Sequence, residues 1–125
     1  MQYKMTQPTA NAIVTVTKDG KKYDVVVVPD PLVVTQPDTL VTFTLSADTP
    51  STITITGLDF PGGDDDQISN VVIAPDGRSI SFTDACTKKI KLHGLLDFAD
   101  SDALGLGGEK FHFEHDPEVD NNPTH

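Results

Sequence analysis

The sequence predicts a single all-β domain, built as an antiparallel β-sandwich of about seven to nine strands. Three observations support this prediction. Apolar and polar residues alternate with a period of two over most of the 125 residues, the alternating runs recur about every ten residues, and the segments between them are rich in Gly, Pro and Asp. The domain is expected to span residues 1–125, with about 1–10 and 117–125 loosely ordered.

Alternating runs fill the first half of the chain. Asp19-Gly20 lies between the first two runs and supplies the positive φ angles of a tight hairpin. The second run ends in four consecutive valines, Val25–Val28, which are apolar on both faces and therefore predict a central strand covered on both sides. The proline at position 29 ends this run, because proline cannot donate to a strand ladder. The expected strands are 12–17, 23–28, 32–34, 40–45 and 52–56.

The second half alternates less regularly. Glycines and three adjacent aspartates make 61–66 a loop. The stretch 95–108 is ambiguous: residues 95–99 could form one helical turn, which the glycines at positions 105, 107 and 108 would end. In the last strand Phe111 and Phe113 are expected to point inward, because residues two apart on a strand share a face. The expected strands are 70–74, 79–83, 89–93 and 109–115.

The formal net charge of −10 is unevenly spread. Residues 1–55 carry four lysines against five aspartates, a net charge of −1, whereas residues 56–125 carry five basic against fourteen acidic groups, a net charge of −9. A negatively charged surface repels phosphate backbones and anionic lipids, which argues against nucleic acid and membrane surfaces as partners. The expected partner is another protein or a second copy of the chain.

Other features of the composition predict a cytoplasmic protein. No apolar run approaches the ~18 residues of a membrane helix. The first ten residues lack the apolar segment of a secretory signal. A single cysteine excludes an internal disulfide and a cysteine-based zinc finger.

Two parts of the sequence resemble known families. Residues 28–34 with 38–43 resemble the opening of a cupredoxin-type domain, although Pro37 stands where that pattern has glycine. Residues 111–122, FHFEHDPEVDNN, resemble the ending of the DP-EP family, small bacterial proteins without an assigned function. The resemblance implies a cupredoxin-like or immunoglobulin-like sandwich and implies no activity.

The copper chemistry of cupredoxins is not expected here. A blue-copper site needs two histidines, a cysteine thiolate and usually an axial methionine. No histidine precedes Cys86, and both methionines, Met1 and Met5, lie near the N-terminus. The sequence therefore predicts no copper site and no cofactor.

Two groups of residues are candidate metal ligands. Asp64, Asp65 and Asp66 are adjacent carboxylates, and a divalent cation would relieve their mutual repulsion. His112 and Glu114 share the expected outward face of the last strand, and His93, also expected to point outward, would complete a site if its strand were a neighbour. The alternatives are a solvated acidic loop and an ordinary polar face.

The sequence favours a non-enzymatic module that binds another protein or has a structural role, with metal binding as the alternative. A weaker hypothesis is a hydrolase, because Cys86, His93 and Asp97 have the residue types of a nucleophilic triad. No glycine-rich oxyanion turn surrounds Cys86, and cysteine is among the most buried residue types. A packed thiol is therefore the preferred interpretation of Cys86, and the chain is not expected to be an enzyme.

Overall fold

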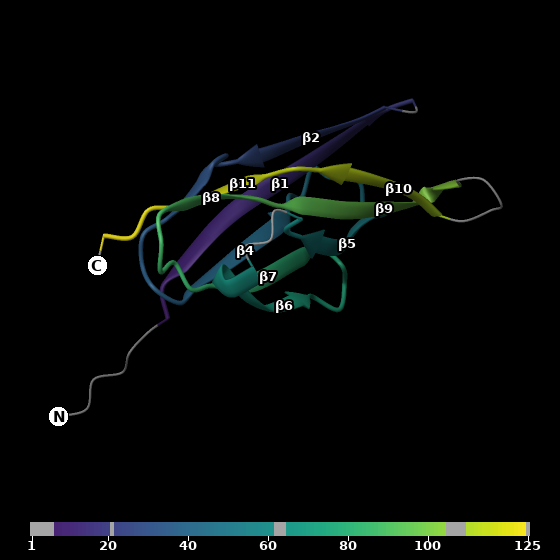
Figure 1. Ribbon diagram of the computed structural model, residues 1–125. Helices are drawn as coiled ribbons and strands as arrows, with labels where there is room; N and C mark the ends of the chain where they lie inside the picture. Colours follow the sequence, from purple (N-terminus) through teal and green to yellow (C-terminus); the bar gives the residue numbers. More distant parts are fainter. Residues whose placement is uncertain (1–6, 21, 62–64, 105–109, 125) are drawn as a thin grey trace.

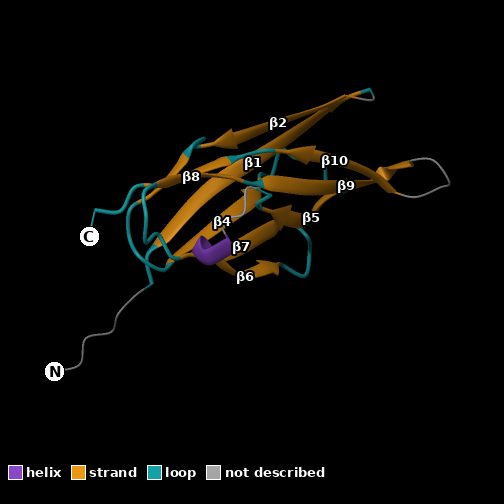
Figure 2. Cartoon of the chain, in the orientation of Figure 1, coloured by secondary structure: helices purple, strands orange, loops and turns teal. Residues whose placement is uncertain are grey.

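The computed structural model describes residues 7–20, 22–61, 65–104 and 110–124 (Figures 1 and 2). The described residues form eleven strands and one short 3₁₀ turn, with no α-helix among them. The elements are β1 (Thr9–Asp19), β2 (Lys22–Val28), β3 (Leu32–Val34), β4 (Thr39–Leu45), β5 (Ile53–Asp59), η1 (Asp65–Gln67), β6 (Ile68–Ile73), β7 (Ser79–Asp84), β8 (Ile90–His93), β9 (Leu95–Leu104), β10 (Lys110–His115) and β11 (Glu118–Asn121).

The strands form a sandwich, which confirms the predicted fold class. One layer is a five-stranded sheet in the order β2-β1-β4-β7-β6. The other layer contains two three-stranded sheets, β10-β9-β5 and β3-β11-β8. Figure 1 shows that β8 runs on into β9 and β10 runs on into β11, so the two smaller sheets share one long hairpin. Gly94 N–H donates to the Pro117 carbonyl at 3.0 Å where both arms of the hairpin change sheet.

Two strand pairs are parallel rather than antiparallel. β4 lies parallel to β1, and β11 lies parallel to β3. The parallel β1–β4 pair follows from the path of the chain, because after β2 it crosses to the other layer, forms β3 there, and returns as β4 beside β1. A crossover of this kind gives the returning strand the same direction as its neighbour.

Two strands were absent from the sequence-based prediction. Residues 95–99, in the stretch that the sequence left ambiguous, belong to β9, and residues 118–121, expected to be loosely ordered, form β11 in the middle of a sheet. At the other end, β1 already begins at Thr9. Aspartate is a poor strand former by propensity, and both strands are rich in acidic residues, but pairing with neighbouring strands overrides that preference.

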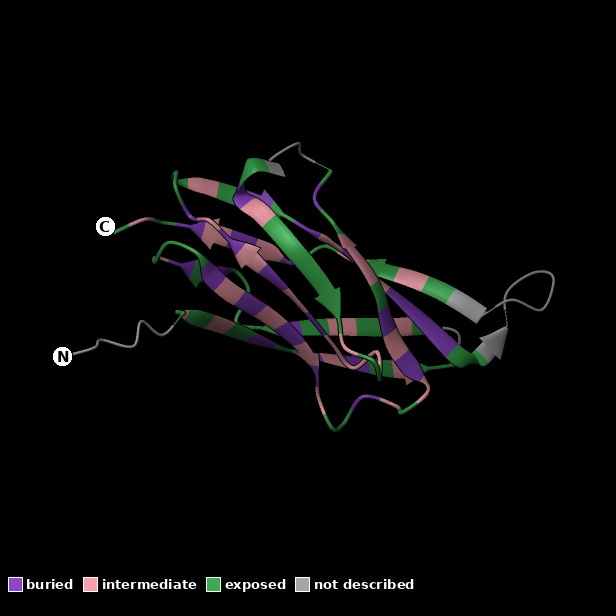
Figure 3. Cartoon of the chain, turned by 90° about the horizontal axis from the view of Figure 1, so that it is seen from below, coloured by how far each residue is buried: buried purple, intermediate pink, exposed green. Residues whose placement is uncertain are grey.

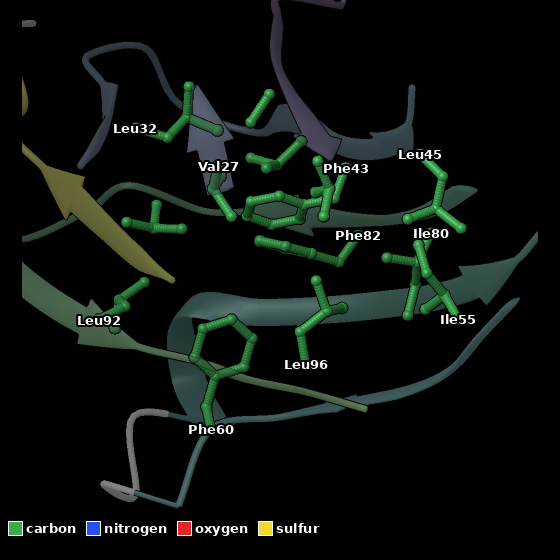
Figure 4. Packing of buried hydrophobic residues seen from close by; sticks show 14 of the residues in the cluster. Val27, Leu32, Phe43, Leu45, Ile55, Phe60, Ile80, Phe82, Leu92 and Leu96 are labelled. Carbon is green, nitrogen blue, oxygen red and sulfur yellow. The ribbon is translucent and has the colours of Figure 1, made fainter. Parts of the chain in front are cut away.

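The hydrophobic core lies between the two layers. Along most strands buried and more exposed residues alternate, as the sequence predicts (Figure 3). Phe82 lies at the centre of the packing, with its ring centroid 6.3 Å from that of Phe43 and 5.5 Å from that of Phe60 (Figure 4). Phe113 is half-buried and packs against this core, whereas the side chain of Phe111 lies outside the described residues.

The valine-rich strand β2 does not occupy the expected central position. It is a terminal strand of the five-stranded sheet and pairs with β1 through seven consecutive residue pairs. Val27 points into the core, but Val26 and Val28 on the opposite face are 56% and 62% exposed. The apolar outer face that predicted a covered strand is therefore open to solvent.

Candidate functional site

The predicted acidic site falls partly outside the described residues. Asp64 and the side chain of Asp65 are not described. Asp66 is exposed, and its carboxylate lies 3.0 Å from Lys88 Nζ. The hydrogen bond from Lys88 lowers the pKa of Asp66. An ion pair with lysine therefore already balances the charge of this carboxylate.

The predicted histidine face does not gather three ligands. His112 and Glu114 point outward on β10, opposite Ala99 and Asp97 of β9. The third candidate, His93, lies on β8, which pairs with β11 rather than β10. Over residues 7–20, 22–61, 65–104 and 110–124, no group of three or more His, Cys, Asp and Glu side chains is arranged to hold a metal ion.

Cys86 is a packed thiol. Its side chain is completely buried, and Sγ donates to the Val34 carbonyl at 3.3 Å. Burial raises the pKa of the thiol, and the nearby Asp84 raises it further. The nucleophile in cysteine catalysis is the thiolate, so this environment disfavours the reactive form. His93 is exposed and lies 3.9 Å from Glu118.

A buried polar network joins β7, β11 and η1. Asp84 Oδ1 accepts hydrogen bonds from Asn121 Nδ2 at 2.8 Å and from Cys86 N–H at 3.0 Å. Gln67 Oε1 accepts from the same Asn121 Nδ2 at 3.3 Å and from Thr87 N–H at 3.0 Å. Because β7 and β11 belong to opposite layers, the network ties the two layers together.

Asp84 is the titratable member of this network. Burial raises its pKa, and the hydrogen bonds from Asn121 and Cys86 offset part of that rise. Asp84 Oδ2 and Asn121 Oδ1 are buried acceptors without a hydrogen-bond donor in the described part of the chain. Protonation of Asp84 removes a buried charge and turns one of its oxygens into a donor, which agrees with the raised pKa.

A second network ties β1 and β2 to β9. Asp100 is completely buried, and its Oδ2 atom lies 3.0 Å from Lys18 Nζ and 2.7 Å from the Tyr23 hydroxyl. Its Oδ1 atom accepts from Asp102 N–H at 2.9 Å. Burial alone would raise the pKa of Asp100, but these hydrogen bonds outweigh it and hold the pKa well below its usual range.

Aromatic rings extend the second network into the core. The ring of Tyr23 stacks on Phe113 with centroids 4.1 Å apart, and Phe113 stacks on Phe98 with centroids 5.0 Å apart. Lys18 Nζ lies 5.7 Å from the centroid of the Tyr23 ring. The arrangement locks the two layers against each other, which is a structural role.

Neither network was predicted from the sequence, although the parity of the strands indicates that both aspartates point inward. Asp84 lies two residues after Phe82, and Asp100 lies two residues after Phe98, so each shares the inward face of a buried ring. An aspartate at an inward position needs hydrogen-bond partners. This parity would have indicated both buried carboxylates.

The backbone of β1 shows which groups of β2 are unpaired. Val16 N–H donates to Thr49 Oγ1 at 2.9 Å. The Val14 carbonyl accepts from Ser46 N–H at 2.8 Å. The backbone polar groups of Val14 and Val16 therefore point away from β2, towards the interior of their sheet.

The residues of β2 opposite these two valines are Val27 and Val25. In an antiparallel pair, residues that face each other either bond to each other or both point their polar groups outward. The N–H and C=O groups of Val25 and Val27 therefore point away from β1, along the open edge of the sheet. Figure 1 shows β2 as the outermost strand of that sheet. This edge is the candidate functional site.

The other terminal strands have features that discourage strand addition. β6 has a register shift between Ser69 and Val72, and Asn70 within it has a φ of 55°. Register shifts also interrupt β5 and β10. β3 and β8 contain only three and four residues. Bulges and short length are the usual protections of edge strands, and among the described strands only β2 is both long and regular at an edge.

An apolar surface accompanies this edge. Ile13 of β1 lies opposite Val28 and is 48% exposed, and Val26 lies two residues before Val28 on the same face. These three side chains, Ile13, Val26 and Val28, are here called the outer apolar patch. Apolar surface beside an unpaired strand is typical of a protein interaction site.

The family model of the DP-EP family matches residues 3–123. The match includes the segment 111–122 that carries the resemblance in the sequence, and it spans every described strand. No curated protein matches the chain. The more distant likeness to cupredoxins is not confirmed by these comparisons. No helix among the described residues is long and apolar enough to cross a membrane. The chain belongs to the DP-EP family.

Proposed function

We propose that the chain is a non-enzymatic protein-binding module that takes up an extended strand of its partner beside β2. The observation that carries the proposal is the unprotected edge of β2, where the N–H and C=O groups of Val25 and Val27 point outward. A strand added there would gain backbone hydrogen bonds, while the outer apolar patch would contact its side chains. The two buried networks support the proposal, because they hold the sheet that presents this edge.

The charge distribution supports a protein as partner. The edge belongs to the nearly neutral part of the chain, residues 1–55 with a net charge of −1, while residues 56–125 carry −9. This balance disfavours nucleic acid and anionic lipid, which need a basic surface. A cytoplasmic site of action is part of the proposal, supported by the single cysteine, Cys86, which leaves the chain without an internal disulfide.

A matched pair of variants tests the proposal. Val26→Lys adds a charge to β2, whereas Val71→Lys adds the same charge to β6 at the opposite edge of the same sheet, where the native side chain is 45% exposed. A lysine on an edge strand blocks strand addition, and neither change affects the core. The immobilised proteins are incubated with a lysate of the organism that encodes the chain, and the captured proteins are identified by mass spectrometry.

The proposal predicts a protein that the native chain and Val71→Lys retain and Val26→Lys loses. Circular dichroism melts of both variants check that the fold is intact. If the three proteins capture the same set, β2 is not the binding site and the proposal is wrong.

A further inference from the structure

We propose that Gln67 covers the buried Asp84–Asn121 pair, and that this cover is closed while Asp84 carries a proton and opens to water when Asp84 is ionised. Gln67 ends η1, which leads directly into β6, at the opposite edge of the five-stranded sheet from β2 (Figure 2). The cover is therefore separate from the β2 edge, and the inference does not depend on the proposed function.

Gln67 is held in place by the segment that follows β7. Its Oε1 atom accepts from Thr87 N–H at 3.0 Å, and its Nε2 atom donates to Thr87 Oγ1 at 2.7 Å. Its backbone carbonyl accepts from Ala85 N–H at 2.8 Å. Gln67 is only 1% exposed, although it belongs to a 3₁₀ turn of three residues. The amides of Ala85 and Thr87 therefore report whether the cover is closed.

One long hydrogen bond connects Gln67 to the Asp84–Asn121 pair. Asn121 Nδ2 donates to Asp84 Oδ1 at 2.8 Å and to Gln67 Oε1 at 3.3 Å, and all three residues are buried. The bond to Gln67 is the longer of the two and therefore the weaker. Separating Gln67 from Asn121 is thus the least costly way for water to reach this pair.

The carboxyl group of Asp84 has hydrogen-bond donors on one oxygen only, within the part of the chain that the structure describes. Oδ1 accepts from Asn121 Nδ2 and from Cys86 N–H, whereas Oδ2 is a buried acceptor without a donor, as is Asn121 Oδ1. A proton on Oδ2 removes the buried charge and turns one of these two acceptors into a donor. An ionised Asp84 needs water at Oδ2 instead, because a buried unpaired charge is costly.

The strands around Asp84 provide no inward-facing charge among the described residues. β3, β4 and β6 contain no charged residue, and Asp84 is the only one in β7. The other neighbouring strands carry their titratable groups at exposed positions or on the face opposite to the buried residues: Asp59 of β5, Lys91 and His93 of β8, and Glu118 and Asp120 of β11.

The segments beside the cover do not compensate the charge either. Their described titratable groups are the exposed Asp38, the exposed Asp66, Lys88 and Lys89, and the buried thiol of Cys86; the side chain of Asp65 lies outside the described residues. Lys88 Nζ already lies 3.0 Å from the carboxylate of Asp66. Burial accordingly raises the pKa of Asp84, and its hydrogen bonds offset only part of that rise.

Ionisation of Asp84 therefore favours the open cover. Because the pKa of Asp84 is raised in the closed form, the proton stabilises that form, and this stabilisation is lost as the pH rises through the folded pKa. The Asp100 network has the opposite sign, since there the ionised carboxylate is the stabilised form. The two ties between the layers thus respond to pH in opposite directions.

An NMR titration combined with amide hydrogen exchange tests the inference on the full chain. The carboxyl carbon of Asp84 should titrate with a midpoint above the ~3.9 of a free aspartate. Corrected for the exchange rate of the unfolded chain at each pH, the protection of the Ala85 and Thr87 amides should decrease as the pH rises through that midpoint. The Gly77 amide, which donates to the Ala74 carbonyl at 2.8 Å in the turn before β7, should keep its protection.

Three variants separate the cover from other effects of pH. Asp84→Asn should keep the Ala85 and Thr87 amides protected at every pH. Asp38→Asn is the matched control, because Asp38 N–H donates to the Ala85 carbonyl at 3.3 Å but its side chain is exposed, and it should behave like the native protein. Gln67→Ala removes the cover, so the midpoint of Asp84 should move down towards ~3.9.

Several results would overturn the inference. These are an Asp84 midpoint at or below that of free aspartate, unchanged protection of Ala85 and Thr87 across the midpoint, or a parallel loss of protection at Gly77. A folded Gln67→Ala variant with the native midpoint would also show that Gln67 does not shield Asp84. If circular dichroism shows that Gln67→Ala is unfolded, the comparison of the native protein with Asp84→Asn decides.

Discussion

Replacing Asp100 with alanine is expected to lower the free energy of unfolding by about 3 kcal/mol. The hydrogen bonds from the Tyr23 hydroxyl and from Asp102 N–H, at 2.7 and 2.9 Å, are bonds to a charged acceptor and contribute roughly 1.5 kcal/mol each. Lys18, whose side chain is 25% exposed, can turn towards water when the carboxylate is removed and adds little. A domain of this size is only about 5–15 kcal/mol stable, so the loss is large.

Urea denaturation followed by circular dichroism measures this loss. Asp102→Ala is the control, because Asp102 is exposed and the substitution keeps the N–H that donates to Asp100. The control should change stability by less than about 0.5 kcal/mol. If Asp100→Ala and Asp102→Ala are equally mild, the Asp100 network does not hold the layers together and the reasoning is refuted.

The pH dependence gives a second readout for the same network. The folded protein holds the pKa of Asp100 below its value in the unfolded chain, which is about 3.9. The ionised carboxylate therefore adds stability above that unfolded value, and the gain disappears as the pH falls through the lower folded value. Asp100→Ala should lose less stability on acidification than the native protein.

Two further substitutions test other parts of the structure. Asp84→Asn keeps the oxygen that accepts from Asn121 and removes a carboxylate whose pKa is raised by burial. A raised folded pKa stabilises the native protein at low pH, and this stabilisation is lost as the pH rises through the folded pKa. At pH 7 Asp84→Asn should therefore be at least as stable as the native protein in urea melts, whereas Asp84→Ala should be less stable. Arg78 donates to four backbone carbonyls of residues 46–53, so Arg78→Lys should lower the urea-derived free energy of unfolding by about 2 kcal/mol, and an unchanged midpoint would show that these bonds are dispensable.

Strand parity made most of the fold predictable. Alternation located nine of the strands. It failed for β9 and β11, where aspartates and glutamates interrupt the apolar pattern and the pairing of distant strands decides the structure. The hydrogen-bond partners of Asp100 were not predictable from the local sequence either, because Lys18 and Tyr23 lie far from it along the chain.

The candidate site was not predictable from local pattern alone. The valines of β2 correctly indicate a strand that is apolar on both faces, but the order of strands in a sheet depends on how the chain crosses between the layers. The histidine site required the strands of His93 and His112 to be neighbours, and the fold places these residues on strands that do not pair. Edge position and strand order are properties of the whole topology.

Amide hydrogen exchange measured by NMR at several protein concentrations tests the central claim most directly. At low concentration the N–H groups of Asp24 and Val26, which bond to β1, should exchange slowly, and those of Val25 and Val27, which point along the open edge, should exchange faster. Where a partner strand occupies this edge, whether from another protein or from a second copy, the account predicts that protection increases at Val25 and Val27. Equal protection of all four amides at every concentration would contradict an open pairing edge at β2.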